Sequence, residues 1–431
     1  MKSMIEKLYD LFLKYPKVTT DSRNIPKDSI FFALKGVNFN GNNFAREALV
    51  KGAALAVVDE EVATTDDRVL LVNNVLETLQ NLATYHRKQL DLKVIGITGT
   101  NGKTTTKELI QAVLKEKYNS FSTKGNFNNH IGVPLTLLSL TSDHEIAVIE
   151  MGANHIGEIE QLCKIALPDY GIITNIGKAH LEGFGGFEGV IKTKTELYNY
   201  IRNTGGTIFI NIDNQLLVDH SEGLNSKTYG ENEPAECRGE ITTDFPFLQL
   251  KCTTKEKVFA VNSQLIGRYN FENILAALCI GNYFKVSSSD MQEAIESYKP
   301  TNNRSQIIKT KLNTLFLDAY NANPSSMNAA IENFATANFE KKVLILGDMA
   351  ELGVESSNEH HSILEFIKSK NFGNVILVGP EFKKANQSFE FMAINDKDQL
   401  EAVLKEMKFA NATILIKGSR KMELEKITHL L

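Results

Sequence analysis

Short runs of apolar and β-branched residues alternate along the chain with longer stretches whose apolar residues recur at helical spacing, a pattern typical of α/β proteins. The short runs predict strands at Ile30–Leu34, Ala54–Val58, Val69–Val72, from Val94 onward, Ile146–Glu150, Gly171–Thr174, Thr207–Ile210, Thr314–Asp318, Val343–Leu346, Val375–Val378 and Thr413–Ile416. The longer stretches predict helices at Phe44–Lys51, Val75–Gln89 and Glu188–Arg202, and one that starts within Gly267–Leu278. We expect Thr207–Ile210 to close its sheet, with shorter antiparallel strands between about 215 and 262.

The length and this alternation together predict three domains. A chain of 431 residues is long for a single core, and the usual size of a domain suggests about three. We place a small N-terminal α/β domain at 1–92, a central domain at 93–301 and a C-terminal domain at 302–431. Because strands alternate with helices, we expect a P-loop-type, mainly parallel sheet in the central domain and a Rossmann-like α/β fold in the C-terminal domain.

The composition is that of a soluble globular protein, with 42% apolar and 23% charged residues. A formal net charge of -5 and the lack of dense Lys or Arg runs argue against a nucleic-acid partner. No apolar run approaches the ~20 residues that span a bilayer, and charges interrupt the N-terminal helical pattern, so we expect neither a membrane segment nor a signal peptide. The four cysteines lack metal-binding spacing, which favours reduced thiols in a cytoplasmic protein.

The stretch Val94–Thr106 carries the strongest chemical signal. A buried strand runs into the turn Gly99-Thr100-Asn101-Gly102, and Lys103-Thr104 then opens a helix. Glycines let backbone N–H groups approach an anion, and the helix N-terminus adds its positive dipole end. Lys103 would lie against the β- and γ-phosphates, and the hydroxyl of Thr104 would bind Mg²⁺. The strict pattern has a glycine where this chain has Ile97, so the match is to the shorter form G-T-x-G-K-T. A plain glycine turn would need neither the lysine nor the threonine, and we therefore expect a nucleoside triphosphate site.

Three further residues suggest chemistry beside this loop. Glu150 ends a strand, where nucleotide-loop enzymes hold Mg²⁺, and we favour that role over a solvated carboxylate. His180 lies alone in a loop and by itself decides nothing. Lys194 falls on the apolar stripe of its helix, whereas Lys192 lies nearly opposite. Burial would lower the pKa of Lys194 and allow its modification or pairing, but from the pattern alone we favour a side chain that reaches the surface.

Polar residues also gather in loops of the first two domains. In the N-terminal domain, Thr20-Asp21-Ser22-Arg23 and Lys35-Gly36 suit an anionic or hydroxylated ligand, although composition slightly favours plain surface turns. The central domain contributes amides that both donate and accept hydrogen bonds, namely Asn126, Asn128, Asn129, Asn270 and Asn273. The last two could reach an adenine or a ribose, although helix caps use asparagine more often.

In the last domain, the predicted strands run into polar segments. Asp318-Ala319-Tyr320-Asn321-Ala322-Asn323 follows one strand and Lys417-Gly418-Ser419-Arg420 follows another, and turn chemistry explains neither well. Because ligands bind at the carboxyl ends of parallel strands, we expect this domain to hold a second substrate or to close over the nucleotide.

Together these segments resemble the Mur ligase family of ATP-dependent amide-forming enzymes, across all three domains. The resemblance rests on the single Arg304 and on the motifs TDSR with FFALKG, GTNGKTTTKE, TKGNFNNHIGVPLTLL, VIEMGANHIGEI, AHLEGFGG, GRYNFENILAAL, DAYNANPSSM, GDMAELG and KGSR. It implies a ligase that joins D-alanyl-D-alanine to UDP-N-acetylmuramoyl-tripeptide. In that chemistry a substrate carboxylate attacks the γ-phosphate of ATP, and the dipeptide amine then attacks the acyl phosphate.

The resemblance also implies a role for each candidate residue. The implied nucleotide contacts are Gly99, Thr100, Asn101, Gly102, Lys103, Thr104, Thr105, Asn270, Asn273, Arg304, Asp318 and Tyr320. The implied ligands of two Mg²⁺ ions are Thr104, Glu150, His180 and Lys194, with Lys194 as a carbamylated lysine. The implied catalytic residues are Lys103, Glu150, His180 and Lys194. The implied substrate contacts are Ser22, Arg23, Lys35 and Gly36 for the UDP-sugar, Asn126, Asn128 and Asn129 for the peptide, and Asn321, Asn323, Lys417 and Arg420 for the dipeptide. Tyr269 and Thr100-Asn101 depart from the family pattern without removing a group that the chemistry requires.

Two other functions remain open at this point. Another amide ligase of the family, which adds the third peptide residue or extends folate with glutamate, would not be expected to carry DAYNANPSSM. A nucleotide-binding switch without ligase activity would have no need of Lys194 on an apolar stripe. The sequence leaves the third peptide residue undecided between diaminopimelate and lysine, and we expect a monomer.

Overall fold

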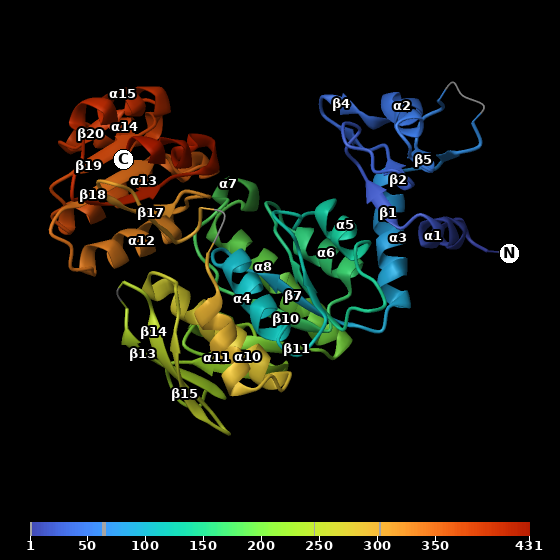
Figure 1. Ribbon diagram of the computed structural model, residues 1–431, viewed down its shortest axis with the longest axis horizontal. Coiled ribbons are helices and arrows are strands. Elements are labelled where there is room, and N and C mark those ends of the chain that lie inside the picture. Colours follow the sequence, from blue (N-terminus) through green and yellow to red (C-terminus); the bar gives the residue numbers. More distant parts are fainter. Residues whose placement is uncertain (1, 63–65, 245, 301–302) are drawn as a thin grey trace.

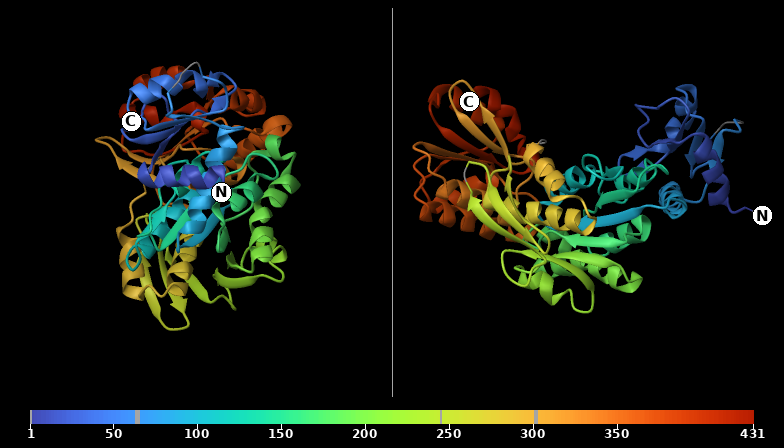
Figure 2. Two further views of the ribbon diagram at one scale, coloured as in Figure 1. Left: turned by 90° about the vertical axis from the view of Figure 1, so that its right-hand side faces the viewer. Right: turned by 60° about the horizontal axis from the view of Figure 1, so that its bottom comes forward.

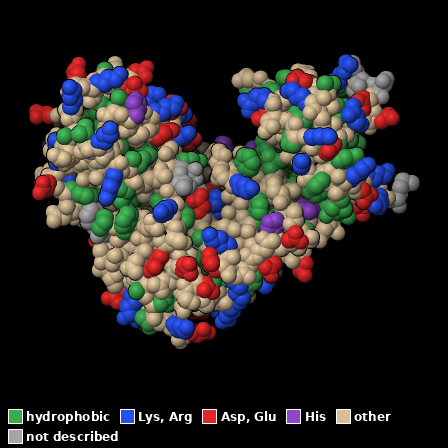
Figure 3. Space-filling model, in the orientation of Figure 1, with side chains coloured by type: hydrophobic (Ala, Val, Ile, Leu, Met, Phe, Trp, Pro, Cys, Tyr) green, Lys and Arg blue, Asp and Glu red, His purple; other side chains and the backbone are tan. Residues whose placement is uncertain are grey.

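The protein folds into three α/β domains in chain order, and its computed structural model describes residues 2–62, 66–244, 246–300 and 303–431 (Figure 1). The N-terminal and C-terminal domains lie at opposite ends of the central domain, as the right-hand view of Figure 2 shows. Between them the surface is hollowed above the central domain (Figure 3). The three-domain α/β fold predicted from the sequence is confirmed.

The N-terminal domain is built on a small parallel sheet with the strand order β1-β2-β5-β6. Its strands are β1 (Lys17–Thr19), β2 (Ser29–Phe32), β5 (Leu55–Val58) and β6 (Val69–Leu71), and a separate hairpin joins β3 (Lys35–Gly36) to β4 (Phe39–Asn40). Its helices are α1 (Met4–Lys14), α2 (Ala45–Val50) and α3 (Val75–Gln89). Helix α3 also packs against α5 (Gly132–Leu137) and α6 (Glu158–Ala166), and it thereby joins this domain to the central one.

The central domain contains a nine-stranded sheet with the order β15-β14-β13-β12-β11-β10-β7-β9-β8. Its strands are β7 (Lys93–Thr98), β8 (Ser120–Ser122), β9 (Ile146–Glu150), β10 (Tyr170–Ile173), β11 (Thr207–Asn211), β12 (Asn225–Gly230), β13 (Cys237–Thr243), β14 (Gln249–Thr254) and β15 (Val258–Asn262). Six strands are parallel, a short parallel pairing adds β13, and antiparallel pairing adds β14 and β15. The helices are α4 (Lys103–Leu114), α5, α6, α7 (Leu181–Phe184), α8 (Phe187–Thr204), α9 (Gln215–Asp219), α10 (Phe271–Tyr283) and α11 (Ser288–Ser297).

One expectation for this sheet was wrong. Thr207–Ile210 does form β11, but β11 does not close the sheet, because β12 pairs with it in parallel and three more strands follow. Strands were expected between about 215 and 262, and β12 to β15 occupy that stretch, but β12 and the start of β13 pair in parallel and only β14 and β15 are added by antiparallel pairing. Because these strands alternate polar residues and pack one face on the apolar helix α10, they lack a continuous apolar run, and the sequence does not show that they extend this sheet.

The C-terminal domain has a six-stranded sheet with the order β16-β17-β21-β18-β19-β20, in which only β16 runs antiparallel to its neighbour. The strands are β16 (Gln306–Lys309), β17 (Thr314–Asp318), β18 (Lys342–Gly347), β19 (Val375–Val378), β20 (Met392–Ile394) and β21 (Thr413–Lys417). Its helices are α12 (Pro324–Thr336), α13 (Ser356–Ser369), α14 (Pro380–Ala385) and α15 (Lys397–Met407). The predicted domain boundary between 301 and 302 lies outside the described residues.

Candidate functional site

The loop between β7 and α4 has the backbone of a phosphate cradle. Gly99 has a φ of +140°, and a Cβ there would lie 2.0 Å from Oγ1 of Thr174. Gly102 has a φ of +78° and precedes the first turn of α4. The loop after β10 braces the turn, because Thr174 Oγ1 donates to the carbonyl of Asn101 at 2.6 Å and the amide of Asn101 donates to Oδ1 of Asn175 at 3.0 Å. At Gly102 an added Cβ would lie 2.6 Å from Oδ1 of Asn273. The positive φ at both positions and these close approaches explain why the turn requires glycine at each.

Lys103 opens α4 and bends back over this turn. Its amine donates to the carbonyls of Gly99 at 2.7 Å and Thr100 at 3.0 Å. Burial lowers the pKa of Lys103 to about 8, against the opposing effect of Glu150. The lysine therefore holds a cationic head group at the mouth of the loop, where an anion can take over its contacts.

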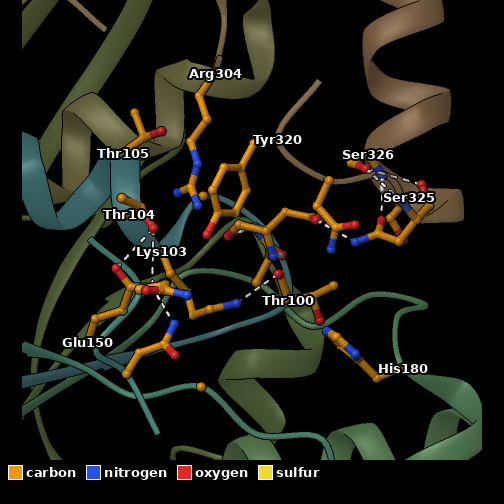
Figure 4. Close-up of a pocket in the computed structure, with 18 of the residues that line it drawn as sticks. Thr100, Lys103, Thr104, Thr105, Glu150, His180, Arg304, Tyr320, Ser325 and Ser326 are labelled. Carbon is orange, nitrogen blue, oxygen red and sulfur yellow. Dashed lines mark hydrogen bonds between the residues drawn. The ribbon is translucent and has the colours of Figure 1, made fainter. Parts of the chain in front are cut away.

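Glu150 ends β9 directly beside the loop, and only 2% of the residue is exposed. Its carboxylate accepts hydrogen bonds from Thr104 Oγ1 at 2.9 Å and from Asn128 Nδ2 at 2.9 Å (Figure 4). Lys107, which is equally buried, lies 3.3 Å away through its Nζ. Burial alone would raise the pKa of Glu150, but Lys107 and then Lys103 outweigh it, and this pKa lies below its ordinary value. The carboxylate is therefore ionised and held in place.

Lys107 was missed by the sequence interpretation. It lies four residues after Lys103 on α4, so both lysines project from one helical face toward the end of β9. The four-residue spacing of the two lysines in GKTTTK could have indicated that they share a helical face. It could not have indicated that Lys107 pairs with Glu150, because that contact depends on where β9 lies.

Lys194 lies inside the molecule on α8, with 3% of the residue exposed. Its amine sits 5.2 Å from the centroid of the Phe184 ring. Burial, followed by repulsion from Lys103, lowers the pKa of Lys194 to about 7. The expectation that this side chain reaches the surface was therefore wrong, since Val190, Leu197 and Tyr198 surround its position with a buried apolar face. The opposite placement of Lys192, which is exposed, is confirmed.

His180 precedes α7 with a φ of +49°, a left-handed conformation that is uncommon outside glycine. The carboxylate of Glu351 lies against its Nδ1 without a hydrogen bond of regular geometry, and this buried nitrogen has no other partner among the described residues. Contact with His180 lowers the pKa of Glu351. Figure 4 shows His180 apart from the group formed by Lys103, Thr104 and Glu150. The structure thus brings Thr104 and Glu150 together but leaves His180 on another wall.

The side-chain chemistry of Thr104, Glu150, His180 and Lys194 decides whether they suit Mg²⁺. Within the described ranges, no three His, Cys, Asp or Glu residues gather as a ready metal centre. The donors at hand are a carboxylate, the hydroxyl that touches it, and an imidazole that lines the same cavity and contacts Glu351 through only one of its two ring nitrogens. Oxygen donors are the ligands that Mg²⁺ prefers, and a carboxylate added to Lys194 would supply another. The donor set fits the ion.

The remaining residues expected to contact the nucleotide come from the central and the C-terminal domains and line the same cavity. The guanidinium carbon of Arg304 stacks 3.8 Å from the ring centroid of Tyr320 (Figure 4). Thr106 Oγ1 donates to Oδ1 of Asn273 at 2.9 Å, and Asn270 donates to the carbonyl of Ile266 at 2.8 Å. Both asparagines are buried and line the cavity, and the contact with Thr106 fixes Asn273 of α10 against α4.

The candidates at the strand ends of the C-terminal domain are held by one another and by the phosphate loop. Lys417 is buried, and its amine pairs with the carboxylate of Asp318 at 2.6 Å and donates to the carbonyl of Asn321 at 3.2 Å. Asn323 caps α12, and its Nδ2 donates across the domain boundary to Oδ1 of Asn101 at 2.8 Å. Arg420 is exposed and pairs with Glu425 at 2.7 Å. The amine of Lys417 is therefore engaged within the protein.

A single cavity of about 750 Å³ joins these groups, with walls from the central and C-terminal domains. The sequence-predicted residues on its walls are Thr100, Asn101, Gly102, Lys103, Thr104, Thr105, Asn126, Asn128, Asn129, Glu150, His180, Asn270, Asn273, Arg304, Asp318, Tyr320, Asn321, Asn323, Lys417 and Arg420. Gly99 and Lys194 are not among the residues that line it. The structure thus assembles residues that are more than 300 positions apart in the sequence.

The four candidates of the N-terminal domain lie away from this cavity. Ser22 is buried, whereas the side chain of Arg23 is 89% exposed and pairs with Asp21 at 2.9 Å. Lys35 pairs with Asp59 at 3.1 Å, and a Cβ at Gly36 would have no neighbour within 4 Å. The structure does not bring this set together with the phosphate loop.

Comparison with known proteins covers nearly the whole chain. Three family models match it: "Mur ligase family, catalytic domain" at 14–90, "Mur ligase middle domain" at 97–281 and "Mur ligase, glutamate ligase domain" at 303–420. The UDP-N-acetylmuramoyl-tripeptide–D-alanyl-D-alanine ligase of Bacillus subtilis is 36% identical over 95% of this chain and 92% of its own length.

Solved structures agree with this assignment. A crystal structure of MurF from Acinetobacter baumannii matches 96% of this chain and 92% of its own, with a TM-score of 0.88 at 30% identity. MurF ligase from Thermotoga maritima in complex with ADP matches 100% of this chain and 98% of its own, with a TM-score of 0.86 at 27% identity. With relatives this similar over their full length and models for each of its three parts, the chain belongs to the Mur ligase family.

Proposed function

We propose that this protein is an ATP-dependent ligase that joins D-alanyl-D-alanine to UDP-N-acetylmuramoyl-tripeptide, yielding UDP-N-acetylmuramoyl-pentapeptide, ADP and phosphate for peptidoglycan synthesis. The UDP-N-acetylmuramoyl-tripeptide–D-alanyl-D-alanine ligase of Bacillus subtilis, which is 36% identical to this chain over nearly its full length, supports this activity. The observation that carries the proposal is the shared cavity, because a phosphate loop and the strand ends of a second α/β domain line one space. An ATP-driven ligase needs that arrangement to bring an activated carboxyl group to an amine.

The cations of the cavity suit the first half of this reaction. A substrate carboxylate that attacks the γ-phosphate of ATP brings two anionic groups together, and that approach requires neutralisation. Lys103 holds its ammonium at the loop, and Arg304 presents its guanidinium from the stack with Tyr320. Asn270, Asn273 and Asp318 complete the proposed nucleotide contacts from α10 and β17. Phosphate contacts from the loop backbone then fix the nucleotide for attack.

Magnesium would be held in this enzyme by Thr104, Glu150, His180 and a carbamylated Lys194, and when bound it would supply further neutralisation of the phosphate charge. Carbamylation needs a neutral amine, which attacks the carbon of CO₂ and releases one proton. A pKa of about 7 gives Lys194 a substantial neutral fraction at physiological pH. We propose that the new carboxylate then lies near Lys103, whose charge already affects the pKa of Lys194.

The remaining candidates we assign to the two substrates. Asn126, Asn128 and Asn129 lie on the cavity wall toward the N-terminal domain and would contact the peptide. Ser22, Arg23, Lys35 and Gly36 would face the UDP-sugar, with the tripeptide spanning the distance to the loop. Asn321, Asn323, Lys417 and Arg420 line the cavity from the C-terminal domain and would receive the dipeptide, with Lys417 acting through its pair with Asp318.

The assay for this function is phosphate release. The protein is incubated with ATP, Mg²⁺ and UDP-N-acetylmuramoyl-tripeptide, with and without D-alanyl-D-alanine, and the nucleotide product is identified by mass. We expect phosphate release that depends on both UDP-N-acetylmuramoyl-tripeptide and D-alanyl-D-alanine. The UDP-sugar product should be heavier than the tripeptide substrate by one dipeptide minus water. Release that needs a different amine would indicate another amide ligase of the family, and hydrolysis without any amine would indicate a nucleotide-binding switch.

For the setting of the reaction, we propose a monomer in the cytoplasm. Among the described residues, no helix is long and apolar enough to cross a membrane. All four cysteines are buried free thiols, which is usual where thiols are kept reduced.

A further inference from the structure

A loop of the C-terminal domain reaches into the central domain, and its position is fixed at both ends. The loop follows β18, and its first residue, Asp348, accepts hydrogen bonds from the amides of Glu381 and Phe382 at 2.9 and 2.8 Å. Farther along, Gly353 packs on Glu182 of α7, where an added Cβ would lie 3.0 Å from the Cβ of Glu182. Hydrogen bonds to Asp348 therefore fix the loop within its own domain, and Gly353 packs closely against the central domain.

Between these two points lies Glu351, whose carboxylate contacts Nδ1 of His180. Nδ1 is buried, and of the residues that the structure describes only Glu351 engages that side of the ring. The imidazole packs edge-on against Phe184, at 6.1 Å between ring centroids and an interplanar angle of 87°. With Nδ1 turned to Glu351, Nε2 is the nitrogen left for a ligand in the cavity that both residues line.

We propose that Glu351 is a positioning residue that orients His180 for metal binding, so that docking of the C-terminal domain completes the metal site of the central domain. The proposal rests on the assignment of His180 as a Mg²⁺ ligand under the function proposed above. A histidine that binds a metal commonly has its other ring nitrogen fixed by a carboxylate, and removal of that carboxylate typically lowers metal affinity 10- to 100-fold. Here the fixing carboxylate comes from a different domain.

A second cross-domain contact separates this role from simple docking. Lys178 pairs with Glu359 of α13 at 2.6 Å, and its backbone amide donates to Oγ of Ser325 at 3.0 Å. Docking thus has contacts besides Glu351. Half of the Glu351 side chain is exposed, and an ion pair that exposed contributes little to docking. Its distinctive effect is then on the orientation of the imidazole.

The test is Mn²⁺ binding, measured by electron paramagnetic resonance on the full-length protein with ADP, where no turnover takes place. We expect Glu351→Ala to weaken one Mn²⁺ site by about 10- to 100-fold. Glu351→Gln keeps an acceptor oxygen for Nδ1 and should recover most of the affinity. Glu355→Ala removes an exposed carboxylate from the same loop, away from His180, and should bind Mn²⁺ as the unaltered protein does. Circular dichroism establishes that each variant is folded.

Two further variants decide the mechanism. In a His180→Gln background, Glu351→Ala should have no additional effect, because both changes remove the same ligand. Glu359→Ala breaks the other cross-domain ion pair and should change Mn²⁺ affinity far less than Glu351→Ala does. Unaltered Mn²⁺ binding by Glu351→Ala, additive losses with His180→Gln, equal losses for Ala and Gln, or an equal loss for Glu359→Ala would each overturn the proposal. Failure of dipeptide-dependent phosphate release in the unaltered protein would overturn the proposed function instead, and it is scored independently of Mn²⁺ binding.

Discussion

Replacement of Lys194 by methionine should make the protein more stable while abolishing ligase activity. Lys194 is 3% exposed, and its amine lies 5.2 Å from the centroid of the Phe184 ring. Glu196 and Glu158 act on it electrostatically, but among the described residues no carboxylate forms an ion pair with it. Folding therefore strips water from an ammonium group without a compensating ion pair. Methionine has a similar length and no charge, so Lys194→Met removes this cost and leaves the apolar face of α8 filled.

The magnitude follows from the shift of the lysine pKa from 10.5 to about 7. At about 1.4 kcal/mol per unit, the buried charge costs up to about 5 kcal/mol. Below pH 7 the lysine is protonated in both the folded and the unfolded chain, and the full cost is present. As the pH rises from 7 to 10.5, the folded protein loses the proton first, the unfolded chain binds more protons, and the free energy of unfolding rises. Lys194→Met should thus gain most at pH 6 and lose its advantage toward pH 10.5.

The measurement is urea unfolding followed by circular dichroism between pH 6 and 10, without Mg²⁺, nucleotide or CO₂. Lys192→Met is the matched control, because Lys192 is exposed two residues away on the same helix. The free energy of unfolding of Lys192→Met should keep a constant difference from that of the unaltered protein at every pH. The free energy of unfolding of Lys194→Met should instead approach that of the unaltered protein as the pH rises. A constant separation of the Lys194→Met curve across this range would refute the assignment of a buried, uncompensated amine.

Three further changes test the rest of the cavity. Glu150→Gln should lower phosphate release at least about 100-fold, and it should destabilise the protein by about 3 kcal/mol because Lys107 loses the counter-charge of its buried pair; unchanged release would contradict the metal role. Arg304→Lys keeps the charge but loses the planar stack on Tyr320, so the KM for ATP should rise severalfold with little change in kcat, and an unchanged KM would remove this stack from the nucleotide site. ATP binding at pH 8 should take up about half a proton, because Lys103, with a pKa of about 8, is half protonated at that pH and the phosphates raise its pKa; calorimetry in buffers of different ionisation enthalpy measures the uptake, and heats independent of the buffer would contradict it.

The phosphate loop was predictable because its chemistry is local in sequence. Gly99 and Gly102 need their backbone angles, and Lys103 and Thr104 follow them within one turn. Glu150 was predictable for a related reason, since parallel strands place their carboxyl ends on one edge of a sheet. The burial of Lys194 was visible in the helical periodicity, yet the periodicity alone could not decide whether a long side chain bends outward.

Other parts of the site depend on distances that no local pattern encodes. The place of Lys107 in the site depends on its contact with Glu150, and that of Glu351 depends on the docking of the C-terminal domain on the central domain. Asn323 was expected among the dipeptide contacts, but its contact with Asn101 spans more than 200 residues of sequence. Strands past β11 were expected, but their pairing onto β11 was not, because the pairing of β12 with β11 is a contact between separate segments that no local pattern encodes.

The charges around Glu150 explain why such a site can be both costly and specific. Lys107, Lys103 and Arg304 all act on its carboxylate, and Lys103 also repels Lys194, so these five groups hold more positive than negative charge. Buried cations without counter-charges destabilise a fold, and a site that served only as scaffold would gain nothing from them. The phosphates of ATP bring the missing negative charges to groups already fixed by the loop, by β9 and by the stack with Tyr320. Because the loop, β9 and the stack with Tyr320 already hold these groups in place, a bound nucleotide would need little rearrangement of them, which is the condition under which electrostatic stabilisation of a phosphoryl transfer is strongest.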